Sequence, residues 1–143
     1  TEIELHISAL IPDDWLGDIH TRLTLYKRIA SAEDEAALRE LQVEMIDRFG
    51  LLPEQTKHLF EVAELRQKAR NIGVSRIDFG DTGGRMEFNE DTKANPMALL
   101  EMIQKHPDDY KLAGPRKLRL TFDVEDANER IRICHELLDK FSR

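Results

Sequence analysis

The chain has 143 residues, of which 41% are hydrophobic and 34% are charged, and this balance is typical of a globular domain with its own core. Its formal net charge is −7, whereas proteins that track the phosphates of DNA are usually basic, so general DNA binding is not expected. Its apolar runs are only a few residues long, which excludes a membrane-spanning helix.

Two further features concern the origin of the chain. It begins at Thr1 rather than at a methionine, which favours a piece of a longer protein over a processed one. Its single cysteine, Cys134, excludes an internal disulfide and is compatible with a reducing cytoplasm. We therefore expect a cytoplasmic domain.

The first third of the chain predicts a short strand and two helices. Residues Ile3–Ile7 alternate between apolar and polar side chains, which is typical of a strand. Asp18 is a suitable N-cap for the first helix, whose predicted buried face consists of Ile19, Leu23, Tyr26 and Ile29. Ser31 is expected to begin the second helix, with Asp34 in a capping-box position. The predicted core face of that helix consists of Leu38, Leu41, Met45 and Phe49.

A corner and a third helix follow. Gly50 is the expected end of the second helix, because glycine adopts a positive φ at no steric cost. Pro53 suits the first turn of the third helix, and Gly73 is expected to end it. Since Phe60 and Ala63 widen its apolar face, this helix is predicted to be the most buried one.

The second half of the chain predicts a hairpin, a helix, two strands and a last helix. Two alternating runs flank the glycine-rich segment Gly80–Gly84 and form the hairpin. Asn95 and Pro96 begin the next helix, in which Leu99, Leu100 and Ile103 are expected to face inward. The strands are predicted at Tyr110–Leu112 and Leu118–Phe122, and the last helix carries an apolar stripe of Ala127, Ile131, Cys134, Leu138 and Phe141. This order of elements predicts an α+β fold, a single domain in which a small antiparallel sheet packs against several helices.

Most motifs that could carry chemistry have a simpler structural explanation. The loop Gly80–Gly84 lacks the lysine and the Ser/Thr of a P-loop, so a hairpin turn is expected rather than a phosphate cradle. The histidines at positions 6, 20, 58, 106 and 135 show no metal-binding spacing, and Cys134 lies on an apolar stripe, as a core residue would. We therefore expect no catalytic residue, no metal, no cofactor and no enzyme activity in this chain.

Two groups of cations keep another function open. One group lies on the third helix and one on the last: Arg66, Lys68 and Arg70, and Arg130, Arg132 and Lys140. Separately, these groups are ordinary solvated faces, but together they could bind nucleic acid or an acidic protein. The alternative function is thus an independent nucleic-acid-binding accessory module, although the net charge disfavours nucleic-acid binding by this domain alone.

The second helix carries an acidic stripe opposite its core face. Glu40, Glu44 and Asp47 recur at spacings of four and three residues, and Arg48 flanks them. Like charges at such spacings destabilise a helix by about 0.2–0.5 kcal/mol per pair. The stripe is therefore either a solvated face or a docking surface for a basic partner, for which such charges set specificity and association rate.

Six short segments occur in a fixed order along the chain: Ile11–Trp15, Arg22–Ala30, Asp47–Pro53 and Glu64–Arg66, followed by the corners Asn95–Pro96 and Gly114–Pro115. Together they resemble the C-terminal (TRCF) domain of bacterial transcription-repair coupling factors. The resemblance covers essentially the whole chain, and it implies that residues 1–143 are the C-terminal regulatory domain of a longer protein.

The resemblance also implies a function. Proteins of this family are ATP-driven DNA translocases that remove stalled RNA polymerase at DNA lesions and recruit nucleotide-excision repair through UvrA. Their motor motifs lie upstream of this domain, and the chain itself contains no G-x-x-x-x-G-K-[ST] sequence. In the family the domain is autoinhibitory, because it clamps the UvrB-like domain of the same chain and masks the UvrA-binding surface.

The family's contact with the UvrB-like domain uses the acidic helix face just before the sequence R-F-G. The resemblance therefore implies that Glu44, Asp47 and Arg48 bind this partner, and Glu40 extends the same stripe. All three matched positions keep the expected residue types.

Overall fold

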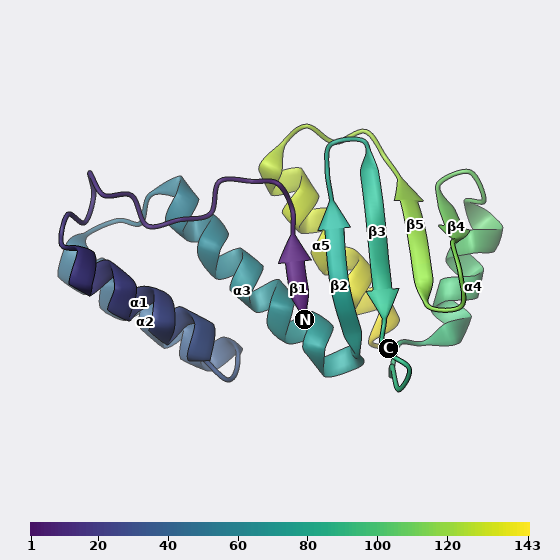
Figure 1. The fold of residues 1–143 in the computed structure, drawn as a ribbon, viewed down its shortest axis with the longest axis horizontal. Helices are drawn as coiled ribbons and strands as arrows, with labels where there is room; N and C mark the ends of the chain where they lie inside the picture. Colours follow the sequence, from purple (N-terminus) through teal and green to yellow (C-terminus); the bar gives the residue numbers. More distant parts are fainter. The chain divides into compact units, whose positions relative to one another are not determined.

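The computed structural model describes all 143 residues and contains five helices and five strands (Figure 1). The strands are β1 (Glu2–Glu4), β2 (Val74–Phe79), β3 (Gly83–Phe88), β4 (Tyr110–Leu112) and β5 (Lys117–Thr121). The helices are α1 (Ile19–Ser31), α2 (Glu35–Phe49), α3 (Glu54–Ile72), α4 (Pro96–Lys105) and α5 (Ala127–Phe141). The α+β class and the predicted order of elements are confirmed. None of the helices combines the length and hydropathy that crossing a membrane requires.

The chain divides into two compact units. The helical unit consists of Ile7–Gln67 and holds α1, α2 and most of α3. The sheet unit consists of Thr1–His6 and Lys68–Arg143 and holds all five strands, α4, α5 and the last residues of α3.

The helical unit is built around one apolar cluster. Asp18 and Asp34 cap its first two helices by accepting hydrogen bonds from the backbone N–H groups of His20 and Ala37. The Gln67 side chain donates to the Ala32 carbonyl at 3.0 Å and so ties α3 to the turn between α1 and α2. The buried cluster contains Ile11, Leu16, Leu25, Ile29, Leu38, Leu41, Met45, Leu52, Phe60 and Ala63.

Two predictions in the helical unit are wrong in detail. Ser31 ends α1 instead of starting α2, because its hydroxyl bonds back to the Lys27 carbonyl while Asp34 itself caps α2. Ile19 and Leu23 are 58% and 51% exposed, so the first half of the predicted buried face of α1 points to solvent.

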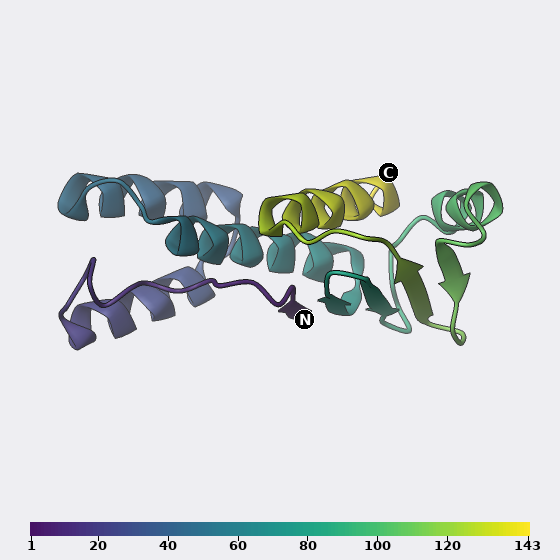
Figure 2. The ribbon, with the colours of Figure 1, turned by 90° about the horizontal axis from the view of Figure 1, so that it is seen from above.

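The sheet unit has the strand order β1-β2-β3-β5-β4. Three of its four strand pairs are antiparallel, and β1 pairs with β2 in parallel. A parallel pair needs a long connection, and the entire helical unit lies between these two strands in the sequence. α4 and α5 lie on the same side of the sheet (Figure 2). Cys134, Leu138 and Phe141 of α5 are buried, as predicted.

The sheet unit also departs from the sequence prediction at two places. The first strand ends at Glu4 instead of Ile7, and His6 follows with a φ of 55°. On α4, Leu100 is 47% exposed, and the buried residue is Met102. Both residues fit a helical apolar spacing, so only the packing partner decides which of them is buried.

Burial makes Cys134 unreactive. The thiol is fully buried, and desolvation raises its pKa to about 12. At pH 8 the reactive thiolate is therefore about one in ten thousand molecules. We expect Ellman's reagent to label the native chain more than about 100-fold more slowly than the urea-unfolded chain. Stoichiometric labelling of the native protein at the unfolded rate would contradict this burial.

Candidate functional site

The acidic stripe lies on the solvent-facing side of α2. Leu38, Leu41 and Met45 are buried in the core of the helical unit, and this burial fixes the rotation of the helix about its axis. Glu40 and Asp47 are consequently exposed, and neither forms an ion pair or a side-chain hydrogen bond within the protein. The structure therefore brings the predicted residues onto one face.

Glu44 differs from its two neighbours because it is already paired. Both terminal nitrogens of Arg28 on α1 donate to its two carboxylate oxygens, with Nη2 to Oε1 at 2.9 Å. Arg48 approaches the same carboxylate at 3.6 Å. The hydrogen bonds from Arg28 lower the pKa of Glu44, and those to Glu44 raise the pKa of Arg28. Glu44 is thus a carboxylate shared by two arginines, and Arg28 is a functional candidate that the sequence did not reveal.

Arg48 is held in place from two directions. Its guanidinium lies 4.7 Å from the centre of the Phe49 ring and also contacts Glu44. The Phe49 ring in turn meets Trp15 edge to face at 5.8 Å between ring centres. The corner that follows is shaped by Gly50, whose φ of 95° ends the helix as predicted. This packing presents a cation beside the acidic stripe on a rigid support.

Exposed apolar side chains accompany the charges on this face. Val43 and Ile46 on α2 are 55% and 38% exposed, and Leu51 in the following loop is 85% exposed. Exposed apolar side chains beside charged groups are a common composition of a protein–protein interface. We name Glu40, Val43, Glu44, Ile46, Asp47 and Arg48 the α2 surface. We did not predict Val43 and Ile46 from the sequence. Their signal was that they are apolar but fall outside the apolar core stripe of α2, which indicates exposure.

A shallow hollow borders the α2 surface. It has a volume of about 360 Å³ and is lined by residues of α1 and α2 and of the turn between them, among them Arg28, Glu40 and Glu44. The hollow gives an incoming side chain access to the Arg28–Glu44 pair.

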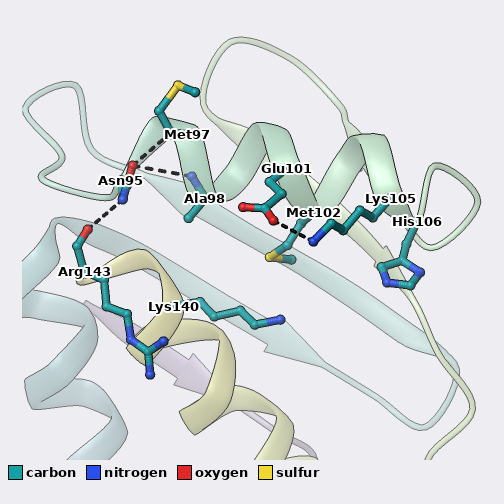
Figure 3. Close-up of a pocket in the computed structure, with 9 residues that line it drawn as sticks. All are labelled: Asn95, Met97, Ala98, Glu101, Met102, Lys105, His106, Lys140 and Arg143. Carbon is teal, nitrogen blue, oxygen red and sulfur yellow. Dashed lines mark hydrogen bonds and ion pairs between the residues drawn. The ribbon is translucent and has the colours of Figure 1, made fainter.

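A second hollow, of about 400 Å³, lies between α4 and α5 in the sheet unit (Figure 3). Its polar groups mostly bond to one another: Asn95 accepts from the N–H groups of Met97 and Ala98, and Lys105 contacts Glu101 at 2.6 Å. The Asn95 side chain also donates to the Arg143 carbonyl at 2.7 Å. These bonds serve helix capping and packing, so this hollow is a weaker candidate than the α2 surface.

At least three of the six cations on the basic helix edges are already engaged within the protein. Arg130 is only 5% exposed and donates to the carbonyls of Leu5 and Val124 at 2.7 and 2.9 Å, so its predicted place on a solvated edge is wrong. Arg132 forms ion pairs with Glu129 and Glu136. Lys68 lies 3.1 Å from Asp139. These pairings weaken the case for nucleic-acid binding through α3 and α5.

The glycine-rich loop is a hairpin turn, as predicted. The Gly80 N–H donates to the Gly83 carbonyl at 2.8 Å, and the two flanking strands pair antiparallel, with Phe79 opposite Gly84 next to the loop. The loop opens no helix, since β3 begins at Gly83.

Comparison with known proteins identifies the family. The family model of the TRCF domain matches residues 5–99. The transcription-repair-coupling factors of Haemophilus influenzae and Escherichia coli are 47% and 44% identical over 137 and 138 residues. Each alignment covers 96% of this chain but only 12% of the relative, so the chain spans about an eighth of the length of these proteins.

A solved structure supports the same fold. The crystal structure of the C-terminal domain of a transcription-repair coupling factor matches with a TM-score of 0.79. The match covers 98% of this chain and 92% of that chain, at 22% sequence identity. At that identity the likeness establishes the fold alone, whereas the family match rests on sequence. The chain therefore belongs to the TRCF domain family of transcription-repair coupling factors.

Proposed function

We propose that this chain is the C-terminal autoinhibitory domain of a bacterial, cytoplasmic transcription-repair coupling factor, an ATP-dependent DNA translocase. Its α2 surface docks on the UvrB-like domain of the same chain and masks the UvrA-binding site until RNA polymerase is engaged. The observation that carries the proposal is the pair of exposed carboxylates without internal partners, Glu40 and Asp47, beside the exposed Val43. Family membership supports the assignment to this class of protein.

The contacts within the helical unit suggest a role for each residue. Glu40 and Asp47 are free to bind arginines of the partner at once, because no internal cation competes for them. Glu44 can join only if an incoming arginine shares it with Arg28 or displaces Arg28. Arg48 is positioned to bind a carboxylate of the partner. Arg28, at the border of the α2 surface, therefore acts as an internal competitor for Glu44.

A surface of this kind suits a releasable clamp. The interface is intramolecular, so tethering raises the effective concentration to about the millimolar range and little intrinsic affinity is required. Exposed ion pairs contribute only about 0–1 kcal/mol each, and salt weakens them further. Such a contact holds while the chain is undisturbed and opens when a competing partner binds.

The test is binding of the 143-residue chain to the purified UvrB-like domain at low and high salt. The unmodified chain is expected to bind more weakly at high salt, and Glu44→Lys/Asp47→Lys is expected to lose at least about tenfold in affinity through charge repulsion. The matched control is Asp13→Lys/Asp14→Lys, which makes the same change in charge at exposed positions of the same unit. Equal losses in both variants would argue for a general charge effect and against docking through α2.

A further variant examines the role of Arg28. Arg28→Gln removes the internal competitor and leaves the carboxylates of α2 intact, so it is expected to preserve or strengthen docking. Loss of docking in Arg28→Gln would instead mean that the partner recognises the Arg28–Glu44 pair as a unit.

A further inference from the structure

The outer face of the sheet carries three neighbouring cations that have no ion-pair partner within the protein. In β3, in β5 and in β2 from Arg76 onward, side chains alternate between the core and this outer face, which lies opposite α4 and α5 (Figure 2). A register shift interrupts the alternation of β2 between Val74 and Arg76. The core side holds Ile77, Met86 and Leu118, all fully buried. On each of these strands, the residues directly before and after the buried one point outward, and most of them are charged.

Strand register places five charged residues side by side across the sheet. The partners across adjacent strands are Glu4 and Asp78, Asp78 and Arg85, Arg85 and Arg119, and Arg119 and Lys111. The line is therefore acidic on β1 and β2 and basic on β3, β5 and β4. We name its basic part, Arg85, Arg119 and Lys111, the basic row.

No member of the basic row has an ion-pair partner, and all three are exposed. Asp78, which lies opposite Arg85, contacts His6 at 2.7 Å and Arg76 at 3.8 Å instead. The neighbouring line is compensated, because Arg76 pairs with Glu2 and Lys117 pairs with Glu87.

This arrangement is unfavourable for the isolated fold. Like charges directly opposite each other on adjacent strands are destabilising, and the basic row contains two such neighbours, Arg85–Arg119 and Arg119–Lys111. The net charge of the chain is −7, but the three adjacent cations have no carboxylate among them. They therefore create a local positive electrostatic potential. An anionic ligand bound across the row would remove the repulsion.

We propose that the basic row binds the phosphate backbone of double-stranded DNA without reading its sequence. Arginine offers a planar fork of donors that matches phosphate, and phosphate contacts require no apolar anchor. The face lacks large apolar side chains, which an acidic protein partner would use as anchors. It also lacks aromatic rings on which single-stranded bases would stack, and the row has no hydroxyl that could read a ribose.

The expected binding is weak and strongly dependent on salt. Three phosphate contacts give a slope of about −2.7 for the logarithm of affinity against the logarithm of salt concentration. Affinity should thus fall about 40-fold between about 50 and 200 mM salt. The row is an auxiliary contact for a protein held near DNA by other means.

The experiment measures fluorescence anisotropy of a labelled short duplex of random sequence with the 143-residue chain at several salt concentrations. The variant Arg85→Gln/Lys111→Gln/Arg119→Gln is expected to lose at least about tenfold in affinity at low salt, and its salt slope should fall toward zero. Its melting temperature should be equal or higher, because the substitutions remove repulsion between neighbours.

The matched control removes three exposed cations that are already ion-paired: Arg39→Gln/Lys105→Gln/Arg132→Gln. Its net charge equals that of the row variant, so it is expected to keep most of the affinity. Equal weakening in both variants would overturn the proposal, as would failure of the unmodified chain to bind DNA at low salt. Tighter binding of polyglutamate than of the duplex would also overturn it and would favour an acidic protein as the ligand.

Discussion

A full-length protein that carries Glu44→Lys and Asp47→Lys is expected to bind UvrA about 10- to 100-fold more tightly than the unmodified protein. The reversal replaces two attractive positions of the α2 surface by repulsive ones, which opens the proposed clamp. The measurement is the dissociation constant of the UvrA complex for both proteins at the same salt concentration.

The size of this effect follows from the population of the open state. If the clamp is closed in about 99% of molecules, UvrA sees a competent surface in about 1% of them, and its apparent affinity falls about 100-fold. That closed population corresponds to about 2.7 kcal/mol, and like-charge contacts at an interface cost several kcal/mol. Two reversed charges are therefore sufficient to open the clamp almost completely.

The control is again the pair Asp13→Lys/Asp14→Lys in the full-length protein. It alters the net charge equally but leaves the α2 surface intact, so UvrA binding should be unchanged. Unchanged UvrA binding by Glu44→Lys/Asp47→Lys would count against masking. Whether the 143-residue chain docks on the isolated UvrB-like domain is a separate question, which the direct binding experiment answers.

The sequence predicted the α2 surface only in part. Periodicity located the helix, its core face and its end at Gly50, and the rotation of the acidic stripe followed from the buried residues. The pairing of Glu44 with Arg28 was out of reach, because it depends on how α1 packs against α2 sixteen residues away in the sequence. A local pattern defines a face, but it does not define what the neighbouring helix places on it.

The basic row illustrates the same limit for a sheet. Alternation predicted each strand separately, yet Arg85, Arg119 and Lys111 form one line only through the order β3-β5-β4 and the register of these strands. The alternation alone leaves both the order and the register open. Strand order therefore carries functional information that the strand patterns alone do not contain.

The misassigned apolar faces have a related cause. On α1, both Ile19–Leu23 and Leu25–Ile29 are spaced four residues apart, and only the second pair is buried. Spacing admits both pairs, and the choice depends on the position of the core of the helical unit. Helix ends were better predicted where a carboxylate or a glycine fixed them, as Asp18 and Gly50 do.

The glycines of the hairpin lead to the second prediction. Gly84→Ala is expected to destabilise the protein by about 3–5 kcal/mol, a large fraction of the roughly 5–15 kcal/mol by which native domains are stable. A Cβ atom at Gly84 would lie 2.8 Å from the carbonyl carbon of Asp78 and 2.9 Å from Cα of Phe79, both on the backbone of β2. Backbone atoms in the middle of a paired sheet cannot move aside as a side chain could, so β2 and β3 would separate. The measurement is the free energy of unfolding in urea.

Gly80→Ala is the matched control, because it makes the same change four residues away in the same hairpin. The nearest atom to a Cβ at Gly80 is the Gly83 carbonyl oxygen at 3.8 Å, an ordinary contact distance. This variant should change stability by less than about 1 kcal/mol, and restriction of the unfolded chain makes a small gain possible. A phosphate cradle would predict a different result, in which both substitutions spare stability and impair anion binding. A large loss of stability in Gly84→Ala alone would show that close packing of the strands requires the glycine at position 84. Phosphate binding would then not be needed to explain this glycine.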